Sequence, residues 1–487
     1  MTTQSGWQRV RALVARGFWL WPALLTLALG LYGSSRAGLW RDELATWSAI
    51  DRSTPQLFDL LKHVDASSGA YYVFEHYWAQ VFGHSLLMLR LPSALAMTGA
   101  AVFVALTGRR LFGPRTGLVS ALIFAVIPAT SRYAQEARSY ALVVCAVSLA
   151  TWLLLRALER PVPLRWLPYA GAVAVAGYLH MVSLVFLAGH ALIVVLRRRA
   201  HGSLRTIAGF ALAAAAGLLP LLPLVLMARR QSGRQLDWLT KPTMQYVVDW
   251  FWRGLFDSTA VSLGILALAL LPVAWPKRRR PAFEIGMLAA LPIGVLWLIS
   301  QGSTAYFLDR YLLFTLPAWA LAAGAGLTAL RPRALTALGL VVLVILGLPD
   351  QRQLRRPYSR EIWDAKAAAA VIAQGYRPGD GLVPVRADMA YLQVGTAIDY
   401  YLPSGIRPKQ VFALGTAADA QDLLPQDCTD EAACLGGTAR LWVATFGTPA
   451  DPLAGLNPAE QKLLGAYTKV RVTPVHGMVV TLLERRS

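Results

Sequence analysis

The stretch LLMLRLPSALAMTGAAVFVALT runs from Leu86 to Thr107 and carries a single charged side chain, Arg90. A helix that spans a bilayer needs about 20 mostly apolar residues, so this stretch is long enough to cross. Ten further stretches have the same character, with soft edges: 17–34, 116–130, 137–156, 165–180, 181–197, 206–227, 258–275, 283–300, 311–330 and 334–349. The sequence therefore predicts an α-helical polytopic membrane protein with eleven transmembrane helices.

The composition agrees with this prediction and excludes other classes. Hydrophobic residues make up 56% of the 487 residues and charged residues only 15%, whereas soluble domains carry about 25% charged residues. Disordered chains are poor in apolar residues and are excluded as well. The net charge of +20 could indicate nucleic acid. However, residues 350–487 hold 15 basic and 14 acidic side chains, which leaves 32 basic and 13 acidic ones in the apolar residues 1–349. The expected partner is therefore the lipid bilayer, and no nucleic acid.

The basic residues between the predicted helices indicate the orientation. With eleven spans, six basic clusters fall on one side, which the positive-inside rule assigns to the cytoplasm. The clusters are Arg9/Arg11/Arg16, Arg109/Arg110/Arg115, Arg156/Arg160/Arg165, Arg197/Arg198/Arg199/Arg205, Lys277/Arg278/Arg279/Arg280 and Arg331/Arg333. One missed or invented span would move every later cluster to the other side. We therefore expect a multi-pass protein of the cell membrane with a cytoplasmic N-terminus.

Two domains are expected, with the boundary at Pro349. Residues 1–349 form the transmembrane domain, with a long outer loop at 35–85, and residues 350–487 form a C-terminal extracytoplasmic α/β domain. A helical pattern covers Glu361–Gln374, and strand-like runs follow. These runs are Leu382–Val385, Val411–Leu414, Arg440–Phe446 and a hairpin over Lys469–Leu483. Alternating helices and strands favour a parallel or mixed sheet.

Three cysteines are present. Cys145 lies in an apolar span and is expected to be a packing residue. Cys428 and Cys434 lie in the outward domain, where an oxidising exterior would permit a disulfide. Two cysteines alone make a poor zinc site. The sequence leaves open whether the pair is bonded.

Ionisable residues at the edge of the apolar segments gather in the loops assigned to the outer side, where such residues are functional by default. The first loop opens with Trp40-Arg41-Asp42-Glu43-Leu44 and continues to Tyr71 and Tyr72. Acidic residues in a first helical turn also interact favourably with the helix dipole, so Asp42 and Glu43 have a structural alternative. The aromatic residues suit a membrane interface and equally suit stacking on sugars.

Three later loops add charge. The second carries Arg132, Glu136 and Arg138, where the alternative is an ion pair of Glu136 with either arginine that caps the following helix. The third carries His180, which would otherwise be a hydrogen-bonded interface residue. The fifth carries Asp309 and Arg310. Positive charge on the outer side suits an anionic lipid phosphate.

Several reaction classes have no support. The sequence contains no P-loop, no dinucleotide-binding glycine motif, no HExxH and no credible Ser/His/Asp set. An enzyme that works outside the cytoplasm has no nucleotide sugars at hand, so a lipid-linked donor is expected.

These segments resemble the GT-C glycosyltransferases, specifically the protein O-mannosyltransferase-like superfamily (glycosyltransferase family 39-like) that includes the lipid A aminoarabinose transferases. The resemblance covers most of the chain and is most specific in the first 140 residues. Its segments are Trp40-x-Asp42-Glu43-Leu44, Tyr71-Tyr72, His76-x-Trp78, Phe82-Gly83, Leu89-Arg90-Leu91-Pro92-Ser93, Arg132 to Ala141, Tyr178-x-His180, Asp309-Arg310-Tyr311-Leu312-Leu313, Trp363-Asp364-Ala365, Pro378-Gly379-Asp380 and Tyr400-Tyr401.

The resemblance implies a GT-C fold and a hexosyltransferase. A sugar, either mannose or another hexose, would pass from a polyprenyl-phosphate-linked donor to an extracytoplasmic acceptor. The acceptor would be a protein, a lipid or a glycan. The reaction would be a single displacement with inversion. Asp42 would be the base, Glu43 would position the acceptor or a metal, and Glu136 would orient the second side of the site.

The expected substrate-binding residues are Arg138 and Arg310 on the phosphate, with His180 weaker, and Tyr71, Tyr72, Arg132 and Asp309. No metal ligand and no certain cofactor is assigned. A divalent cation, Mg²⁺ or Mn²⁺, stays an open alternative, because arginines could supply the same charge.

One departure concerns the acceptor side. Relatives usually read Asp-x-His-Pro-Pro-Leu-Tyr-Tyr where this chain has Asp65-Ala66-Ser67-Ser68-Gly69-Ala70-Tyr71-Tyr72. Any contact of the missing His cannot be carried over, so acceptor choice should differ.

Two other functions remain as alternatives. A flippase or transporter of the lipid carrier would show internal repeats and broken helices near the midplane, and the sequence shows neither repeat nor mid-span charge. An inactive scaffold paralogue would fit the lost His-Pro-Pro, whereas the intact Asp42 and Glu136 argue against it.

Overall fold

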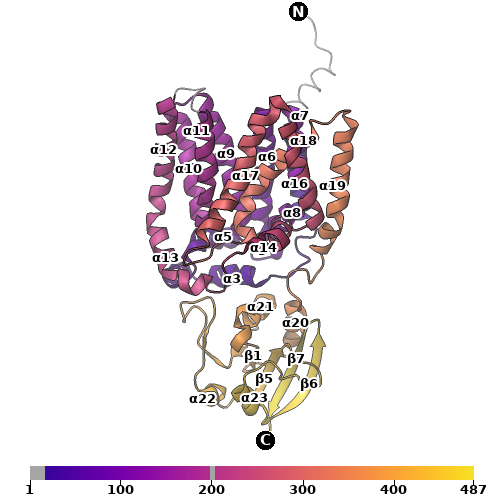
Figure 1. Cartoon of the computed structure of the whole chain (residues 1–487). Coiled ribbons are helices and arrows are strands. Elements are labelled where there is room, and N and C mark those ends of the chain that lie inside the picture. The colour runs from indigo at the N-terminus through magenta and orange to yellow at the C-terminus, as the bar shows by residue number, and fades with distance from the viewer. Residues whose placement is uncertain (1–16, 198–202, 487) are drawn as a thin grey trace, which may run out of the picture. The chain divides into compact units, whose positions relative to one another are not determined.

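The computed structural model describes residues 17–197 and 203–486 (Figure 1). The basic residues Arg9, Arg11, Arg16, Arg198 and Arg199, which contribute to two of the predicted cytoplasmic clusters, lie outside the described residues.

The chain forms two compact units. The helical unit comprises the residues up to Ser34, together with Asp65–Tyr71 and Leu87–Gln353. The α/β unit comprises Ser35–Val64, Tyr72–Leu86 and the residues from Leu354 onward. Most of the predicted outer loop 35–85 thus packs within the same unit as the C-terminal sheet.

The helical unit is built from apolar helices that follow the hydropathy of the sequence. Each of the eleven predicted spans coincides with a helix or with two or three consecutive helical segments. The helices are α2 (Leu20–Leu31), α6 (Leu86–Phe112), α7 (Pro114–Val126), α8 (Pro128–Ala134), α9 (Tyr140–Glu159), α10 (Pro163–Leu179), α11 (Phe186–Arg197), α12 (Ser203–Leu218), α13 (Leu222–Leu236), α14 (Met244–Tyr246), α15 (Trp252–Phe256), α16 (Thr259–Leu270), α17 (Pro276–Ile299), α18 (Leu316–Leu327) and α19 (Ala334–Gln353).

By length and hydropathy, fewer of the described helices than the eleven predicted spans qualify as membrane-spanning. Among the described residues, five helical stretches are long and apolar enough to cross a membrane, or up to seven if each of two bent pairs is one span. The bends are 65° between α7 and α8 and 98° between the stretch Met244–Phe256 and the stretch Thr259–Ala274. Several of the remaining helices are shorter because proline or 3₁₀ turns interrupt them. The number of crossings therefore stays a prediction.

Small residues let the helices approach closely. A Cβ at Gly117 of α7 would overlap the backbone of Ala105 and Arg109 in α6, so only glycine fits at this crossing. Helix α10 packs against both α9 and α12, and the three lie side by side (Figure 1). The resulting core is apolar throughout its centre, from Met97 and Phe124 to Phe314.

The α/β unit contains a five-stranded mixed sheet of order β2-β1-β5-β7-β6 (Figure 1). Strand β1 pairs in parallel with β2 and β5, whereas β7 pairs antiparallel with β5 and β6. This confirms the small C-terminal sheet domain and the final hairpin. The strands are β1 (Gly381–Pro384), β2 (Lys409–Gln410), β5 (Arg440–Thr445), β6 (Tyr467–Val475) and β7 (Met478–Arg485), and a separate pair is β3 (Ala413–Leu414) with β4 (Gln426–Asp427).

The sheet separates two small cores because side chains alternate along each strand. Leu382, Trp442 and Leu482 belong to the core that also contains residues of α20 (Ala365–Gly375) and α21 (Val394–Tyr401). Their neighbours Val383 and Val443 belong to the core under α23 (Pro458–Leu464).

The long loop after α2 contributes two further helices to this unit. Helices α3 (Arg41–Ile50) and α4 (Thr54–His63) precede a short turn and α5 (Gly69–Phe82). Leu39 and Leu44 belong to the same core as α20 and α21, which explains why this loop packs with the C-terminal residues.

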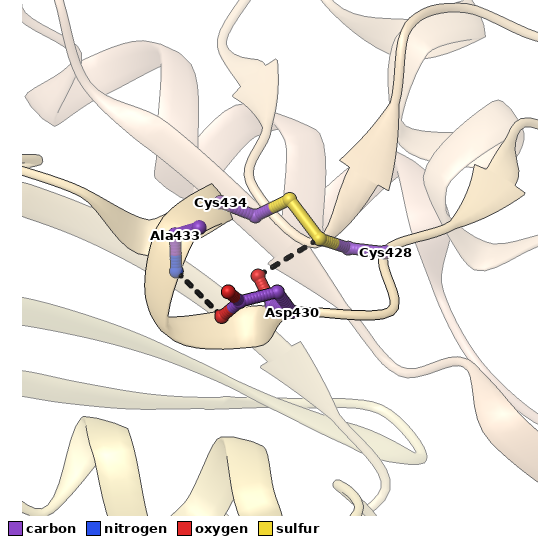
Figure 2. The surroundings of a disulfide bond; sticks show 4 residues. All are labelled: Cys428, Asp430, Ala433 and Cys434. Carbon is purple, nitrogen blue, oxygen red and sulfur yellow. Dashed lines mark hydrogen bonds between the residues drawn. A yellow bond between two sulfur atoms is a disulfide. The ribbon is translucent and has the colours of Figure 1, made fainter.

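The two cysteines of the α/β unit form a disulfide. Figure 2 shows the bond between Cys428 and Cys434, whose Cα atoms are 6.7 Å apart. Between them, the Asp430 carboxylate accepts a hydrogen bond from the Ala433 amide at 3.0 Å and caps the short helix α22 (Glu431–Leu435). Cys145 is free and half-buried in α9.

Candidate functional site

The predicted catalytic aspartate lies in the first turn of α3, in the α/β unit. The residue before it is held at both backbone groups, because the Arg41 amide donates to Glu361 Oε1 at 3.3 Å and the Arg41 carbonyl accepts from Gln393 Nε2 at 3.0 Å. Burial raises the pKa of the Glu361 carboxyl. Asp42 itself is half-buried. A carboxylate on a helical turn that is held at both backbone groups is well positioned to accept a proton.

Glu43 is placed differently from its neighbour. Its carboxylate is buried, at 1% exposure, and Oε2 accepts a hydrogen bond from Arg360 Nη1 at 2.9 Å. The Arg360 side chain is itself only 7% exposed. Sequence reasoning missed Arg360, which lies 317 residues from Glu43.

The two tyrosines of α5 lie in packed surroundings. Tyr71 and Tyr72 are both 0% exposed. Tyr71 belongs to the helical unit and Tyr72 to the α/β unit. Neither ring offers an open face to a sugar in this conformation.

The turn between α8 and α9 carries Glu136 and Arg138, in the helical unit. The hydroxyl of Ser93 in α6 donates to the Glu136 carbonyl at 2.6 Å and reaches the Arg138 carbonyl at 3.3 Å. Arg138 Nη2 donates to Ser68 Oγ at 3.4 Å. The segment Leu89–Ser93, which carries part of the family resemblance, therefore helps to fix the position of this charged turn.

Arg132 forms an ion pair that the sequence did not indicate. Its Nη1 atom lies 3.0 Å from Asp257 Oδ1, at the bend between α15 and α16. Asp257 adopts a left-handed backbone conformation with φ of 52°. Glu136 adds a further electrostatic interaction with Arg132. The local signal was an aspartate within an otherwise apolar stretch, but its partner is 125 residues away.

His180 and Arg310 line one small cavity of the helical unit, together with Tyr140 and Tyr311. The His180 ring lies 4.6 Å from the Tyr311 ring, and the charges of Arg138 and Arg310 both act on His180. The cavity measures about 10 Å³, which is room for a single water. A phosphate would fit only after a side chain such as Arg310 moved.

Asp309, which directly precedes Arg310, helps to hold this residue in place. Its Oδ1 atom accepts a hydrogen bond from the Arg310 amide at 2.8 Å. On its other side, Asp309 packs against Gly254 of α15, where any Cβ would overlap the carboxylate. Arg310 also stacks over the ring of Trp238 at 5.7 Å.

The structure thus brings six of the predicted residues into one region of the helical unit, the basic cluster: Arg132, Glu136, Arg138, His180, Asp309 and Arg310. Asp42, Glu43 and Tyr72 belong to the α/β unit. In the part of the chain that the structure describes, no group of three or more His, Cys, Asp or Glu side chains is arranged to hold a metal ion.

The combination of an apolar helical bundle and a small mixed-sheet unit is shared with solved structures. The crystal structure of ArnT from Cupriavidus metallidurans in the apo state has this fold, with a TM-score of 0.62 and 15% identity over 96% of this chain and 98% of that chain. ArnT bound to undecaprenyl phosphate matches with a TM-score of 0.57 and 14% identity over 99% and 98%. The apo oligosaccharyltransferase of Archaeoglobus fulgidus matches with a TM-score of 0.50 and 10% identity over 88% and 69%.

The sequence comparison covers a smaller part of the chain. Residues 71–227 match the family described as dolichyl-phosphate-mannose-protein mannosyltransferase. No curated protein matches the sequence. The resemblance to the GT-C glycosyltransferases is therefore confirmed by a family match and by the fold.

Proposed function

We propose that this chain is an integral-membrane glycosyltransferase that moves a sugar from a polyprenyl-phosphate carrier to an acceptor outside the cytoplasm. The observation that carries the proposal is the basic cluster, on a fold shared over nearly its whole length with ArnT, which has been solved with undecaprenyl phosphate bound. Arginine side chains form strong charge-assisted hydrogen bonds with phosphate, so a cluster of them in apolar surroundings suits a lipid phosphate. Mannose or another hexose is the proposed sugar, and the description of the matching family, dolichyl-phosphate-mannose-protein mannosyltransferase, supports mannose.

In the proposed reaction, the acceptor hydroxyl attacks the anomeric carbon of the donor. The bond between that carbon and the phosphate oxygen breaks, and the configuration inverts. Asp42 takes the proton from the acceptor hydroxyl as the new bond forms. Arg138 and Arg310, with His180, stabilise the negative charge that develops on the departing polyprenyl phosphate. Arg132 and Asp309 hold this region in place through their contacts with Asp257 and Gly254.

The remaining assignments follow from the same proposal. Glu136 orients the charged turn next to Arg132. Glu43 acts as a positioning residue, because its buried ion pair with Arg360 holds the α3 turn that carries Asp42. Eleven crossings, a cytoplasmic N-terminus and an extracytoplasmic domain from residue 350 would place the charged loops on the side where lipid-linked sugars are used.

Sugar transfer in liposomes tests the proposal. The purified chain would receive polyprenyl-phosphate-mannose and a panel of other polyprenyl-phosphate hexoses, with an envelope fraction as acceptor. We expect transfer by the native chain and a loss of about 10² to 10⁴ in rate for Asp42→Asn, the range typical of a lost general base. Asp59→Asn in α4 is the matched control, because Asp59 pairs with Lys62 at the surface of the same unit.

Two outcomes would contradict the proposal. If the native chain transferred no sugar from any donor of the panel, the glycosyltransferase function would be wrong. If Asp42→Asn transferred as fast as Asp59→Asn, the assignment of the base would be wrong, although the class of enzyme would stand.

A further inference from the structure

A large polar cavity lies in the α/β unit, away from the residues discussed so far. Its volume is about 610 Å³, within the usual range of small-molecule sites. Residues at the end of α3, the start of α4, α21 and β2 line it, and we call it the α3–α21 cavity. The residues used below are Trp47, Asp51, Arg52, Asp399, Arg407 and Lys409.

The walls of this cavity can bind hydroxyl groups. Asp51 and Asp399 offer carboxylate oxygens, and Gln410, whose Nε2 donates to Asp399 Oδ2 at 3.3 Å, also lines the cavity. Carboxylates and amides in one wall pair with hydroxyls that both donate and accept hydrogen bonds. Trp47 adds an aromatic ring, which Tyr400 and His84 hold edge-on at 5.0 Å and 5.3 Å. A rigid aromatic ring beside such groups suits the apolar face of a sugar.

The cavity also carries cationic groups. Arg407 and Lys409 are exposed and line its wall. Arg52 is 7% exposed, and its Nη2 atom donates to the Asp422 carbonyl. Its Nε and Nη1 atoms have no hydrogen-bond partner among the residues that the structure describes. A nearly buried guanidinium with unused donors favours an anionic group nearby.

We propose that the α3–α21 cavity binds an anionic saccharide, a sugar chain that carries a carboxylate or a phosphate. Trp47 contacts a ring of the saccharide, Asp51 and Asp399 accept hydrogen bonds from its hydroxyls, and the three cationic side chains bind its anionic group. Asp51, Asp399 and Asp422 already act on Arg52 and Arg407, and the anionic group of the saccharide would add a further counter-charge to the three cations.

The same helix connects this cavity to the proposed base. Asp42 lies in the first turn of α3 and Asp51 caps its C-terminal end, nine residues later, so the cavity lies about 14 Å along the helix from Asp42 at 1.5 Å per residue. A saccharide of a few units could extend over this length within the one unit. That the bound saccharide is the acceptor rests on the proposed function, whereas its binding does not.

Calorimetric titration of the purified full chain, with no donor present, tests the binding. The probes are trigalacturonate and mannose 6-phosphate, with maltotriose and inorganic phosphate as the neutral and sugar-free comparisons. We expect at least one of the two anionic sugars to bind about tenfold or more tighter than maltotriose and inorganic phosphate, as charge-assisted hydrogen bonds imply. Trigalacturonate alone would indicate a uronic saccharide, and mannose 6-phosphate alone a phosphorylated one.

Substitutions locate the binding. The pair Arg407→Gln with Lys409→Gln should weaken it about tenfold, and both residues are exposed, so the fold is not at risk. Lys469→Gln, an exposed lysine on β6, is the matched control and should bind as the native chain does. Equal binding by the pair and the control would overturn the site, as would maltotriose or inorganic phosphate binding as tightly as both anionic sugars, or no binding by either anionic sugar.

The two proposals can fail separately. If the chain bound the saccharide but transferred no sugar, the cavity assignment would be supported and the proposed function would be wrong. Transfer that Asp42→Asn abolishes, in a chain that binds neither anionic sugar, would do the reverse.

Discussion

The helical unit and the α/β unit hold their charged side chains in different ways. In the helical unit, charges sit within a largely apolar bundle and meet one another, as in the pair Arg132–Asp257 and around His180. In the α/β unit, buried ion pairs such as Glu43–Arg360 and Asp380–Arg440 fix turns, while other charges line an open cavity.

Functional sites are therefore marked by different features in the two units. In apolar surroundings an ionisable residue is costly, so a cluster of them is itself a sign of a site. In a domain with polar surroundings, a buried ion pair is weak evidence of function. A cavity lined by polar and charged side chains is better evidence of a binding site. The predictions below test this contrast, from the largest expected effect to the smallest.

The largest effect is expected for the buried pair of α3. Glu43→Gln leaves the Arg360 guanidinium buried without its carboxylate, which should destabilise the α/β unit by about 3 kcal/mol or more. Hydrogen exchange of the amides in β5 and β7 would measure the loss. The double variant Glu43→Leu with Arg360→Met should recover most of it. If Glu43→Gln left the exchange unchanged, the pair would not be what holds this turn.

A smaller, pH-dependent effect is expected at Asp399. Burial raises its pKa to about 6, while Gln410 and Arg407 act in the opposite direction and Asp51 adds to the rise. The folded state binds this proton more tightly than the unfolded state, so its stability contribution is full below about pH 4 and lost as pH rises through about 6.

Asp399→Asn should remove this dependence. The variant should match the native chain near pH 4 and exceed it at pH 7.5 by roughly 2 kcal/mol, because the native chain then carries a buried charge. Thermal unfolding at both pH values measures the difference. A constant difference at the two pH values would show that Asp399 does not titrate differently on folding.

An effect of similar size, but independent of pH, is expected at the disulfide. Cys428 and Cys434 close a loop with a sequence separation of 6, and a loop of this size should contribute about 2 kcal/mol by restricting the unfolded chain. Replacing both cysteines with serine should lower the unfolding temperature of the α/β unit and leave sugar transfer intact. Loss of transfer in a folded variant would give this loop a functional role.

The long helices of the helical unit could be predicted because each carries a long apolar run, whereas α14 and α15 lie between two predicted spans, where no helix was expected. The bends could be predicted only in part. Pro128 lacks an amide hydrogen and explains the 65° bend before α8. The 98° bend at Asp257 has no glycine or proline within it. Asp257 ends α15 in a left-handed conformation, the Ser258 hydroxyl caps α16 by accepting from the Val261 amide at 3.2 Å, and the pair with Arg132 adds a tertiary contact. The strand predicted at Val411–Leu414 was right only for Ala413–Leu414, which form β3 and pair with β4 outside the five-stranded sheet, whereas β2 ends earlier at Gln410.

The site could be predicted as a set of residues but not as an arrangement. The segment from Arg132 to Ala141 and the pair Asp309–Arg310 were recognisable from sequence. Their partners Asp257 and Gly254 were not, because nothing local marks a contact over such a distance along the chain. Arg360 was missed for the same reason.

Binding of the lipid carrier tests the central claim most directly. The purified chain would be titrated with undecaprenyl phosphate and, for comparison, with undecaprenol, which lacks the phosphate. The account predicts that the native chain prefers the phosphate form and that Arg138→Gln and Arg310→Gln each weaken it about tenfold or more, as for a lost hydrogen bond to a charged group. Arg160→Gln, an exposed arginine after α9, should bind as the native chain does. Equal binding of the phosphate form by all four proteins, or no preference for it over undecaprenol, would contradict the account.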